Sequence, residues 1–238
     1  MTTNSSPRFP DDRIGFDIVG FDLDGTLLDT SGDLAAAVNH ALASIGRDPL
    51  PVAQLRTMIG GGGRHMLAQG MTATGGYTEA QLDTLLQRLL DHYADHIAVE
   101  TRPFHQCLAA LDALAAQGAR LAVVTNKTEA LAKKLLEALG LTDRFVTIIG
   151  GDTLGAERRK PSPAPIHEMI ARLGGGTAAF VGDSIFDVEA AKAAGVPVVA
   201  CSFGFLDRPV DELGADAVID DYADLLPTLA RLFAARPA

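Results

Sequence analysis

The sequence predicts an α/β protein in which a doubly wound parallel sheet carries an all-helical insertion after its first strand. Two patterns support this fold class. From residue 99 onward, short apolar runs typical of buried strands alternate with helical patterns. Residues 31–98 instead show helical spacing of apolar residues and no clear strand. We therefore expect a Rossmann-like core domain formed by residues 1–30 and 99–238, and a helical cap domain formed by residues 31–98.

The first expected element is a short buried strand. Residues 1–13 are rich in Ser, Thr, Pro and charged side chains, which predicts a loose tail. The mostly apolar run "FDIVGFDLD" follows and delivers Asp22 and Asp24 at its C-terminal end. A helical pattern then begins near Ser31, which is a candidate N-cap.

The insertion is predicted to hold two shorter helices, "VAQLRTMIG" and "GGRHMLAQGM", and a long helix, "TEAQLDTLLQRLLDHYADHI", with Thr78 as its N-cap. Gly60 to Gly63 form either a flexible turn between helices or a phosphate-binding loop. Arg64 either binds a substrate carboxylate or lies exposed on the surface. The histidines of this segment are interpreted as surface residues of the cap: His65, His92 and His96.

The rest of the chain alternates between helix and strand, as expected for a parallel sheet with helical crossovers. The expected helices cover residues 101–118, 128–140, 162–174, 186–195 and 223–235. The expected strands cover residues 119–126, 145–151, 177–184, 196–201 and 215–220.

The acidic composition argues against some classes of partner. The formal net charge is −10, and no basic patch that could bind nucleic acid or an anionic membrane is visible in the sequence. We therefore expect a small metabolite as the partner, and either a monomer or a homodimer. An acidic protein that binds an anion needs local positive charge, from a metal ion, helix N-termini or a few cationic side chains.

The cysteine pattern and the hydropathy favour a cytoplasmic protein. Cys107 and Cys201 lie far apart and belong to no CxxC or Cys/His cluster, so they predict neither a disulfide framework nor a zinc site. The first residues lack the basic and apolar regions of a secretory signal, and no apolar run is long enough to span a membrane.

Polar residues follow three of the predicted strands, at the edge where ligands bind in doubly wound sheets. Asp22 and Asp24 end the first strand, Thr125 and Asn126 end a second, and Asp183 ends a later one. These carboxylates would repel each other strongly in one crevice unless a cation joined them, and oxygen ligands suit Mg²⁺. The sequence therefore predicts a magnesium site, and Mg²⁺ in turn favours phosphoryl transfer.

Four motifs carry a resemblance to a known family. "FDLDGTLLDT", "VVTN", "RRKPSPAP" and "VGDSIFDVEAAKAAG", in this order, resemble the motifs of the haloacid dehalogenase superfamily of phosphohydrolases. The resemblance covers the core from residue 16 to about residue 200. It implies that Asp22 attacks the phosphoryl group to form an aspartyl-phosphate, while Asp24 protonates the leaving oxygen and later activates water. Gly25 would allow a sharp turn that opens the strand end to a ligand.

The same resemblance assigns the other motif residues. Thr125 and Asn126 would bind the phosphate, although with Lys127 and Thr128 they also mark the start of a helix. Lys160 would offset the negative charges of the nucleophile and the phosphate. The implied ligands of Mg²⁺ are Asp183, the Asp22 side chain and the main-chain carbonyl of Asp24. The implied supports of the metal-bound water are Asp187 and Ser184.

The helical insertion resembles the cap of a subgroup that contains phosphoglycolate phosphatases, β-phosphoglucomutases and phosphonatases. "GGDTL", "KPSPAP" and "IGGGGRHML" look most like phosphoglycolate phosphatases, and Asp24 argues against the dehalogenase branch. Alternatives are a phosphatase for a sugar phosphate, a nucleotide or pyrophosphate, a phosphomutase, and a non-catalytic protein that binds a phosphorylated ligand. Arg158 and Arg159 either steer anions or lie on a solvated loop.

Overall fold

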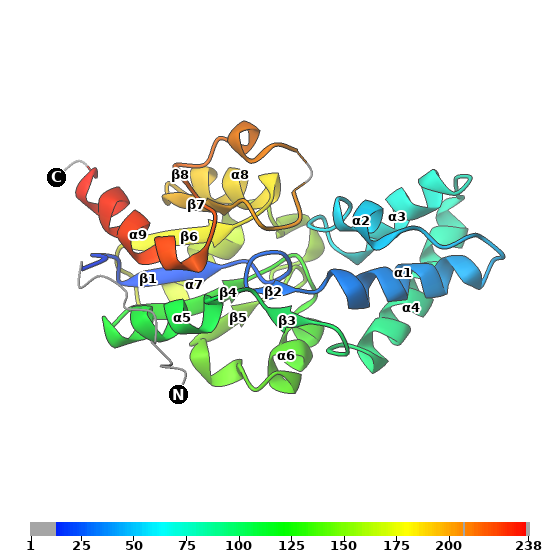
Figure 1. Cartoon of the computed structure of the whole chain (residues 1–238), viewed down its shortest axis with the longest axis horizontal. Coiled ribbons are helices and arrows are strands. Elements are labelled where there is room, and N and C mark those ends of the chain that lie inside the picture. Colours follow the sequence, from blue (N-terminus) through cyan, green and yellow to red (C-terminus); the bar gives the residue numbers. More distant parts are fainter. Residues whose placement is uncertain (1–12, 207, 237–238) are drawn as a thin grey trace, which may run out of the picture.

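The fold is known from a computed structural model that describes residues 13–206 and 208–236 (Figure 1). Almost all of the expected N-terminal tail, residues 1–12, lies outside the described residues. A six-stranded parallel sheet forms the centre of the core, in the order β5-β4-β1-β6-β7-β8. Its strands are β1 (Ile18–Phe21), β4 (Arg120–Val124), β5 (Thr147–Ile149), β6 (Ala178–Gly182), β7 (Val198–Cys201) and β8 (Ala217–Ile219). The predicted doubly wound parallel sheet is therefore confirmed.

Helices cover both faces of this sheet because its strands bury apolar side chains on both sides (Figure 1). Within β1, Val19 and Phe21 belong to one apolar cluster and Ile18 to the other. The helices of the core are α5 (Cys107–Ala116), α6 (Glu129–Ala138), α7 (Ala164–Arg172), α8 (Ile185–Ala193) and α9 (Leu225–Ala234). Short 3₁₀ turns connect them: η1 (Thr142–Arg144), η2 (Ala156–Arg158), η3 (Val210–Leu213) and η4 (Tyr222–Asp224).

The helical insertion lies at one end of the molecule (Figure 1). It consists of α1 (Ser31–Ala43), α2 (Val52–Arg56), α3 (Gly63–Ala73) and α4 (Glu79–Asp95). Thr78 is the N-cap of α4 as expected, since its hydroxyl oxygen accepts a hydrogen bond from Gln81 N and its backbone N–H donates one to Gln81 Oε1. Ser31 is the first residue of α1 and not its N-cap, because the N-cap position belongs to Thr30.

A short two-stranded ribbon joins the insertion to the core. β2 (Leu28–Asp29) and β3 (Arg102–Pro103) pair in antiparallel fashion, so the chain leaves the core and returns to it side by side. The buried Asp33 carboxylate holds this connection together, because it accepts hydrogen bonds from the backbone of Glu100 and from the backbone and hydroxyl of Thr101. None of the described helices combines the length and the apolar composition needed to cross a bilayer.

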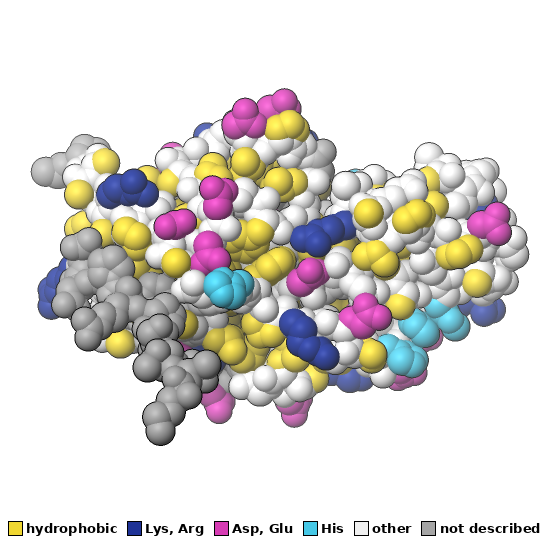
Figure 2. All heavy atoms as spheres, in the orientation of Figure 1, with side chains coloured by type: hydrophobic (Ala, Val, Ile, Leu, Met, Phe, Trp, Pro, Cys, Tyr) yellow, Lys and Arg dark blue, Asp and Glu magenta, His cyan; other side chains and the backbone are white. Residues whose placement is uncertain are grey.

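The surface in Figure 2 carries both signs of charge, with Lys and Arg set among Asp and Glu. Histidines gather on the insertion, where the rings of His40 and His92 stack with centroids 4.2 Å apart and those of His92 and His96 with centroids 4.3 Å apart. The exposure of His65 and His96, and the partial exposure of His92, agree with the interpretation of these residues as surface side chains of the cap.

Candidate active site

The sheet order brings the predicted motif residues together. β1 lies between β4 and β6, and Phe21 is in register with Val123 on one side and Val181 on the other. The residues that follow these strands therefore emerge at the same edge, where Asp22 N donates a hydrogen bond to Val181 O over 2.9 Å. This edge is the one at which doubly wound sheets bind ligands.

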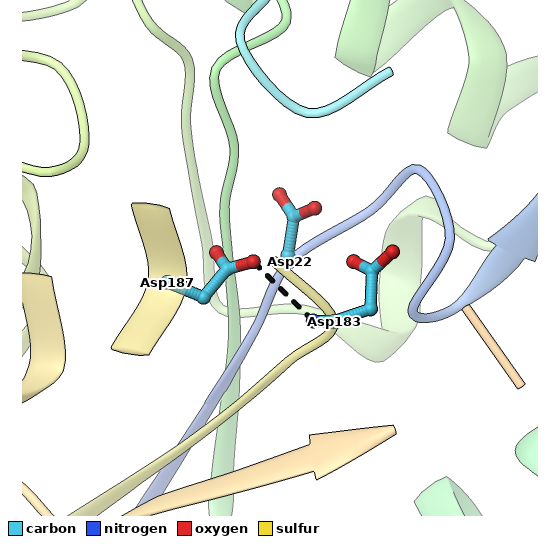
Figure 3. Close-up of side chains that lie close together, drawn as sticks. All are labelled: Asp22, Asp183 and Asp187. Carbon is cyan, nitrogen blue, oxygen red and sulfur yellow. Dashed lines mark hydrogen bonds between the residues drawn. The ribbon is translucent and has the colours of Figure 1, made fainter. Parts of the chain in front are cut away.

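Three buried carboxylates, those of Asp22, Asp183 and Asp187, form a cluster at this edge (Figure 3). One oxygen of each lies within 4.8 Å of the others. Asp187 is held in place by its neighbours, because its Oδ2 accepts hydrogen bonds from Ser184 Oγ and from the backbone N–H groups of Ser184 and Asp183. Ser184 and Asp187 thereby form a capping box that begins α8.

Lys160 is the cation of this cluster. Its ammonium group lies 2.7 Å from Asp22 Oδ1, 2.5 Å from Asp187 Oδ1 and 2.8 Å from the backbone oxygen of Val124. Only 2% of the lysine is exposed. The three donors of the ammonium group are thus all used, which fixes the Asp22 carboxylate against a positive charge.

The charges of the cluster do not balance. Burial raises the pKa of Asp22 to about 6, although the ammonium group of Lys160 opposes the shift. Burial and the neighbouring carboxylates of Asp187 and Asp22 also raise the pKa of Asp183. Three carboxylates against one ammonium leave an excess of negative charge, and the donor set is made only of oxygen atoms. The cluster can therefore hold a divalent metal ion.

The turn after β1 depends on a glycine. Gly25 has a φ of +86°, and a Cβ atom at this position would overlap the Asp183 carboxylate. The same turn places Thr26, whose hydroxyl donates to Asp183 Oδ1 over 2.9 Å, while Phe205 N donates to Asp183 Oδ2 over 2.6 Å. Gly25 therefore leaves room for the Asp183 carboxylate, which any side chain at this position would displace.

The Asp24 side chain is bound by residues outside the acidic cluster. Its Oδ1 accepts a hydrogen bond from Thr30 Oγ1 over 2.8 Å, and its Oδ2 lies 2.9 Å from the ammonium group of Lys127. Lys127 also donates to the hydroxyl of Tyr93, a residue of the insertion, over 3.0 Å. Burial raises the pKa of Tyr93 to about 12, so the phenol stays protonated at neutral pH.

The sequence marks Lys127 only as part of a helix start, whereas in the structure Lys127 is a partner of Asp24. Burial lowers the pKa of Lys127, but Asp24 and Tyr93 outweigh this effect and raise it overall. Lys127 is therefore a charged ammonium group that links the core to the insertion. The signal in the sequence was a lysine directly behind two polar residues at a strand end.

Thr125 and Asn126 lie beside the acidic cluster, at the end of β4. Thr125 Oγ1 accepts a hydrogen bond from Lys127 N over 3.2 Å. The Asn126 amide donates to the backbone oxygens of Gly60 and Lys160, over 3.1 Å and 3.0 Å. Asn126 therefore connects the insertion with the loop that carries Lys160. Its Oδ1 is buried, and the described residues offer it no hydrogen-bond partner.

A cavity of about 180 Å³ opens between the core and the insertion. Asp22, Asp24 and Asn126 line it from the core, and apolar side chains of the insertion such as Leu89 and Met66 line the opposite side. Arg64 also lines the cavity, but its guanidinium group forms ion pairs with Asp83 and, at 2.6 Å, with Glu79. The structure thus brings Arg64 to the site with two acidic partners.

The fold and the site define an α/β enzyme whose carboxylates meet at the ends of parallel strands. Comparison with known proteins then identifies the family. The haloacid dehalogenase-like hydrolases match residues 19–201, and the chain belongs to this family. The family resemblance of the four motifs is thereby confirmed. Because relatives that cover most of the chain are phosphatases, the protein is a phosphatase.

Several proteins similar to this chain are named phosphoglycolate phosphatase. The chain is 43% identical to the phosphoglycolate phosphatase of Agrobacterium fabrum over 88% of its own length and 90% of the relative. It is 45% identical to that of Rhodospirillum rubrum, with 86% and 87% of the two chains covered. Among solved structures, a predicted phosphoglycolate phosphatase from Haemophilus somnus is similar with a TM-score of 0.83 and 31% identity, covering 90% of this chain and 98% of that one.

Proposed function

We propose that the protein is a Mg²⁺-dependent phosphatase that hydrolyses 2-phosphoglycolate to glycolate and phosphate through an aspartyl-phosphate. The observation that carries this proposal is the buried Asp22 carboxylate. Its Oδ1 lies 2.7 Å from Lys160 Nζ, and Asp22 lines the cavity between the core and the insertion. The shared name of the relatives supports the choice of substrate. Residues 31–98 would act as a cap that keeps bulk water from the reacting groups.

In the first step, Asp22 acts as the nucleophile. A bond forms between one of its carboxylate oxygens and phosphorus, and the bond from phosphorus to the ester oxygen breaks. The electron pair leaves with that oxygen, which takes a proton from the protonated form of Asp24. Lys160 contacts Asp22 directly, so its positive charge stabilises the negative charge that accumulates on the phosphoryl group.

In the second step, a water molecule attacks the phosphorus of the aspartyl-phosphate. Asp24 accepts a proton from this water, the bond between Asp22 and phosphorus breaks, and phosphate leaves. The contacts of Asp24 with Lys127 and with the Thr30 hydroxyl hold its carboxyl group in a fixed orientation at the rim of the cavity. Thr125 and Asn126 would bind the phosphate oxygens at the start of the loop that leads to α6.

The donor set at the strand ends suits Mg²⁺. We propose that the side chains of Asp22 and Asp183 and the backbone carbonyl of Asp24 hold this ion, with Asp187 and Ser184 orienting the surrounding water. Asp187 suits a supporting role because its oxygens are already bound by Lys160, Ser184 and the Asp183 backbone. A bound Mg²⁺ would supply positive charge for the phosphate oxygens.

Phosphate release from a panel of substrates tests the proposed function. The panel holds 2-phosphoglycolate, sugar phosphates, nucleotides, pyrophosphate and p-nitrophenyl phosphate, each with Mg²⁺ or with EDTA. We expect the highest kcat/KM for 2-phosphoglycolate, loss of activity in EDTA and recovery when Mg²⁺ is restored. Metal-dependent release that favours another substrate would contradict the substrate assignment, and no release from any compound would contradict the phosphatase reaction.

The buried ion pair of Lys127 and Asp24 gives a prediction about stability. Lys127→Met leaves the Asp24 carboxylate buried without its cation, so we expect the free energy of unfolding to fall by about 3–5 kcal/mol. The matched control is Lys133→Met, which removes an exposed lysine paired with Glu129 and is expected to cost less than about 1 kcal/mol. Urea unfolding, followed by circular dichroism, measures both changes.

A double variant separates the ion pair from simple loss of packing. Replacing Asp24 by Asn in the Lys127→Met background removes the unpaired charge, so part of the lost stability should return. Equal costs for Lys127→Met and Lys133→Met, or no recovery in the double variant, would contradict the view that Lys127 neutralises Asp24.

A further inference from the structure

The cavity has three cationic side chains in its lining, as far as the described residues show, and two of them are already paired. Arg64 forms ion pairs with Glu79 and Asp83. Lys127 lies against Asp24 and donates to Tyr93. Arg159 also lines the cavity, and no carboxylate of the described residues forms an ion pair with it. Among the described cationic side chains of the lining, Arg159 is therefore the one whose charge no carboxylate neutralises.

The position of Arg159 puts this charge between the core and the insertion. The residue follows η2 and directly precedes Lys160, so its backbone is anchored beside the acidic cluster. Its side chain reaches the turn at Gly60 to Gly63 in the insertion, since a Cβ atom added to Gly62 would lie 3.7 Å from Arg159 Nη1. Gly62 has a φ of +88° and lines the cavity too. Arg159 thus lies where the two parts of the site meet.

We infer that Arg159 is the specificity-determining residue that binds the carboxylate of the substrate, at the end opposite the phosphoryl group. This inference rests on the proposed function. The planar guanidinium group can hold a carboxylate through two parallel hydrogen bonds. The apolar side chains that line the cavity, such as Leu86 and Leu90 of the insertion, offer an anion no such partner. A substrate without the carboxylate loses this contact but keeps those to its phosphate.

The test compares 2-phosphoglycolate with ethyl phosphate, which has the same phosphate and two carbon atoms but no carboxylate. The measured quantity is the ratio of the two kcat/KM values. We expect Arg159→Gln to lower this ratio by about 10- to 100-fold, mainly through a higher KM for 2-phosphoglycolate, because a charged hydrogen-bonded contact is lost. Arg159→Lys keeps the charge but loses the planar geometry, so its ratio of kcat/KM values should lie between those of the wild-type protein and Arg159→Gln.

Two other arginines serve as comparisons. Arg158 is exposed, does not line the cavity and precedes Arg159 in the same loop, so Arg158→Gln controls for the loss of one surface charge. We expect it to keep the ratio of the wild-type protein. Arg64→Gln tests the competing assignment, in which the arginine of the insertion binds the carboxylate.

The outcomes distinguish this inference from the proposed function. A wild-type protein that prefers 2-phosphoglycolate, together with an Arg159→Gln variant that keeps the preference, would overturn the role of Arg159 alone. Loss of the preference in Arg64→Gln instead, or an equal decrease for both substrates in Arg159→Gln, would also overturn it. A wild-type protein without preference for 2-phosphoglycolate over ethyl phosphate would overturn the proposed substrate, whatever the variants do.

Discussion

Replacing Asp22 by Asn is expected to abolish turnover of 2-phosphoglycolate, with a decrease in kcat of at least about 10⁴-fold. The reason is chemical, because an amide oxygen is a much weaker nucleophile than a carboxylate oxygen. The fold should persist, since Asn has nearly the same size and Lys160 keeps its contacts with Asp187 and the Val124 carbonyl. Release of phosphate measures the activity, and thermal unfolding by circular dichroism measures the stability.

A surface aspartate provides the matched control. Asp143 lies exposed in η1, so Asp143→Asn removes the same charge from the protein without touching the site. Its kcat should equal that of the wild-type protein. An Asp22→Asn variant that folds and retains a near-normal rate would exclude Asp22 as the nucleophile. An Asp22→Asn variant that is inactive but also unfolded would call for Asp22→Ala, for which the same loss of turnover is expected.

The core of the site could be predicted from the sequence because each of its parts follows from local pattern and topology. Asp22 and Asp183 directly follow apolar runs, and both runs became parallel neighbours in the sheet. Parallel strands end at one edge, so proximity of the two carboxylates needed no knowledge of side-chain packing. The turn at Gly25 was likewise encoded locally, as a glycine directly after the second aspartate.

Contacts between the core and the insertion could not be predicted in this way. Lys127, in the loop that follows β4, and Tyr93 of α4 meet only through the packing of the insertion on the core, and no periodicity within either segment fixes that arrangement. Arg64 is a comparable case, since its ion pairs with Glu79 and Asp83 depend on how α3 lies against α4. The sequence could identify these charged residues but not their partners, which are set by tertiary packing.

This difference matters for function because the contacts between the core and the insertion, which the sequence did not predict, surround the cavity that would select the substrate. The proposed reacting groups Asp22 and Asp24 follow a strand of the core, whereas other side chains that line the cavity come from the insertion and from the residue that precedes Lys160. A change in the insertion can therefore alter the shape and charge of the cavity while Asp22, Lys160 and Asp183 keep their positions. Under the proposed mechanism, chemistry and specificity would therefore be carried by different residues.

Replacing Asp24 by Asn is expected to slow 2-phosphoglycolate hydrolysis by about 10²- to 10⁴-fold, since the variant can neither protonate the leaving oxygen nor activate water. The substrate p-nitrophenyl phosphate separates these two roles. Its leaving group is a good one and needs little protonation, so formation of the aspartyl-phosphate should stay fast, whereas its hydrolysis should be slow. A stopped-flow measurement should then show a burst of p-nitrophenol close to one equivalent per active site, followed by slow turnover.

The wild-type protein and the Asp143→Asn variant supply the comparison, because water activation is intact in both and any burst should be smaller than in Asp24→Asn. The Thr30 hydroxyl can still hydrogen-bond to the oxygen of an asparagine at position 24, so the side chain keeps its orientation and only the proton transfer is lost. Equal slowing of both substrates without a burst would contradict the role of Asp24 in the second step. Such a result would instead place its main effect on the attack by Asp22, before the leaving group departs.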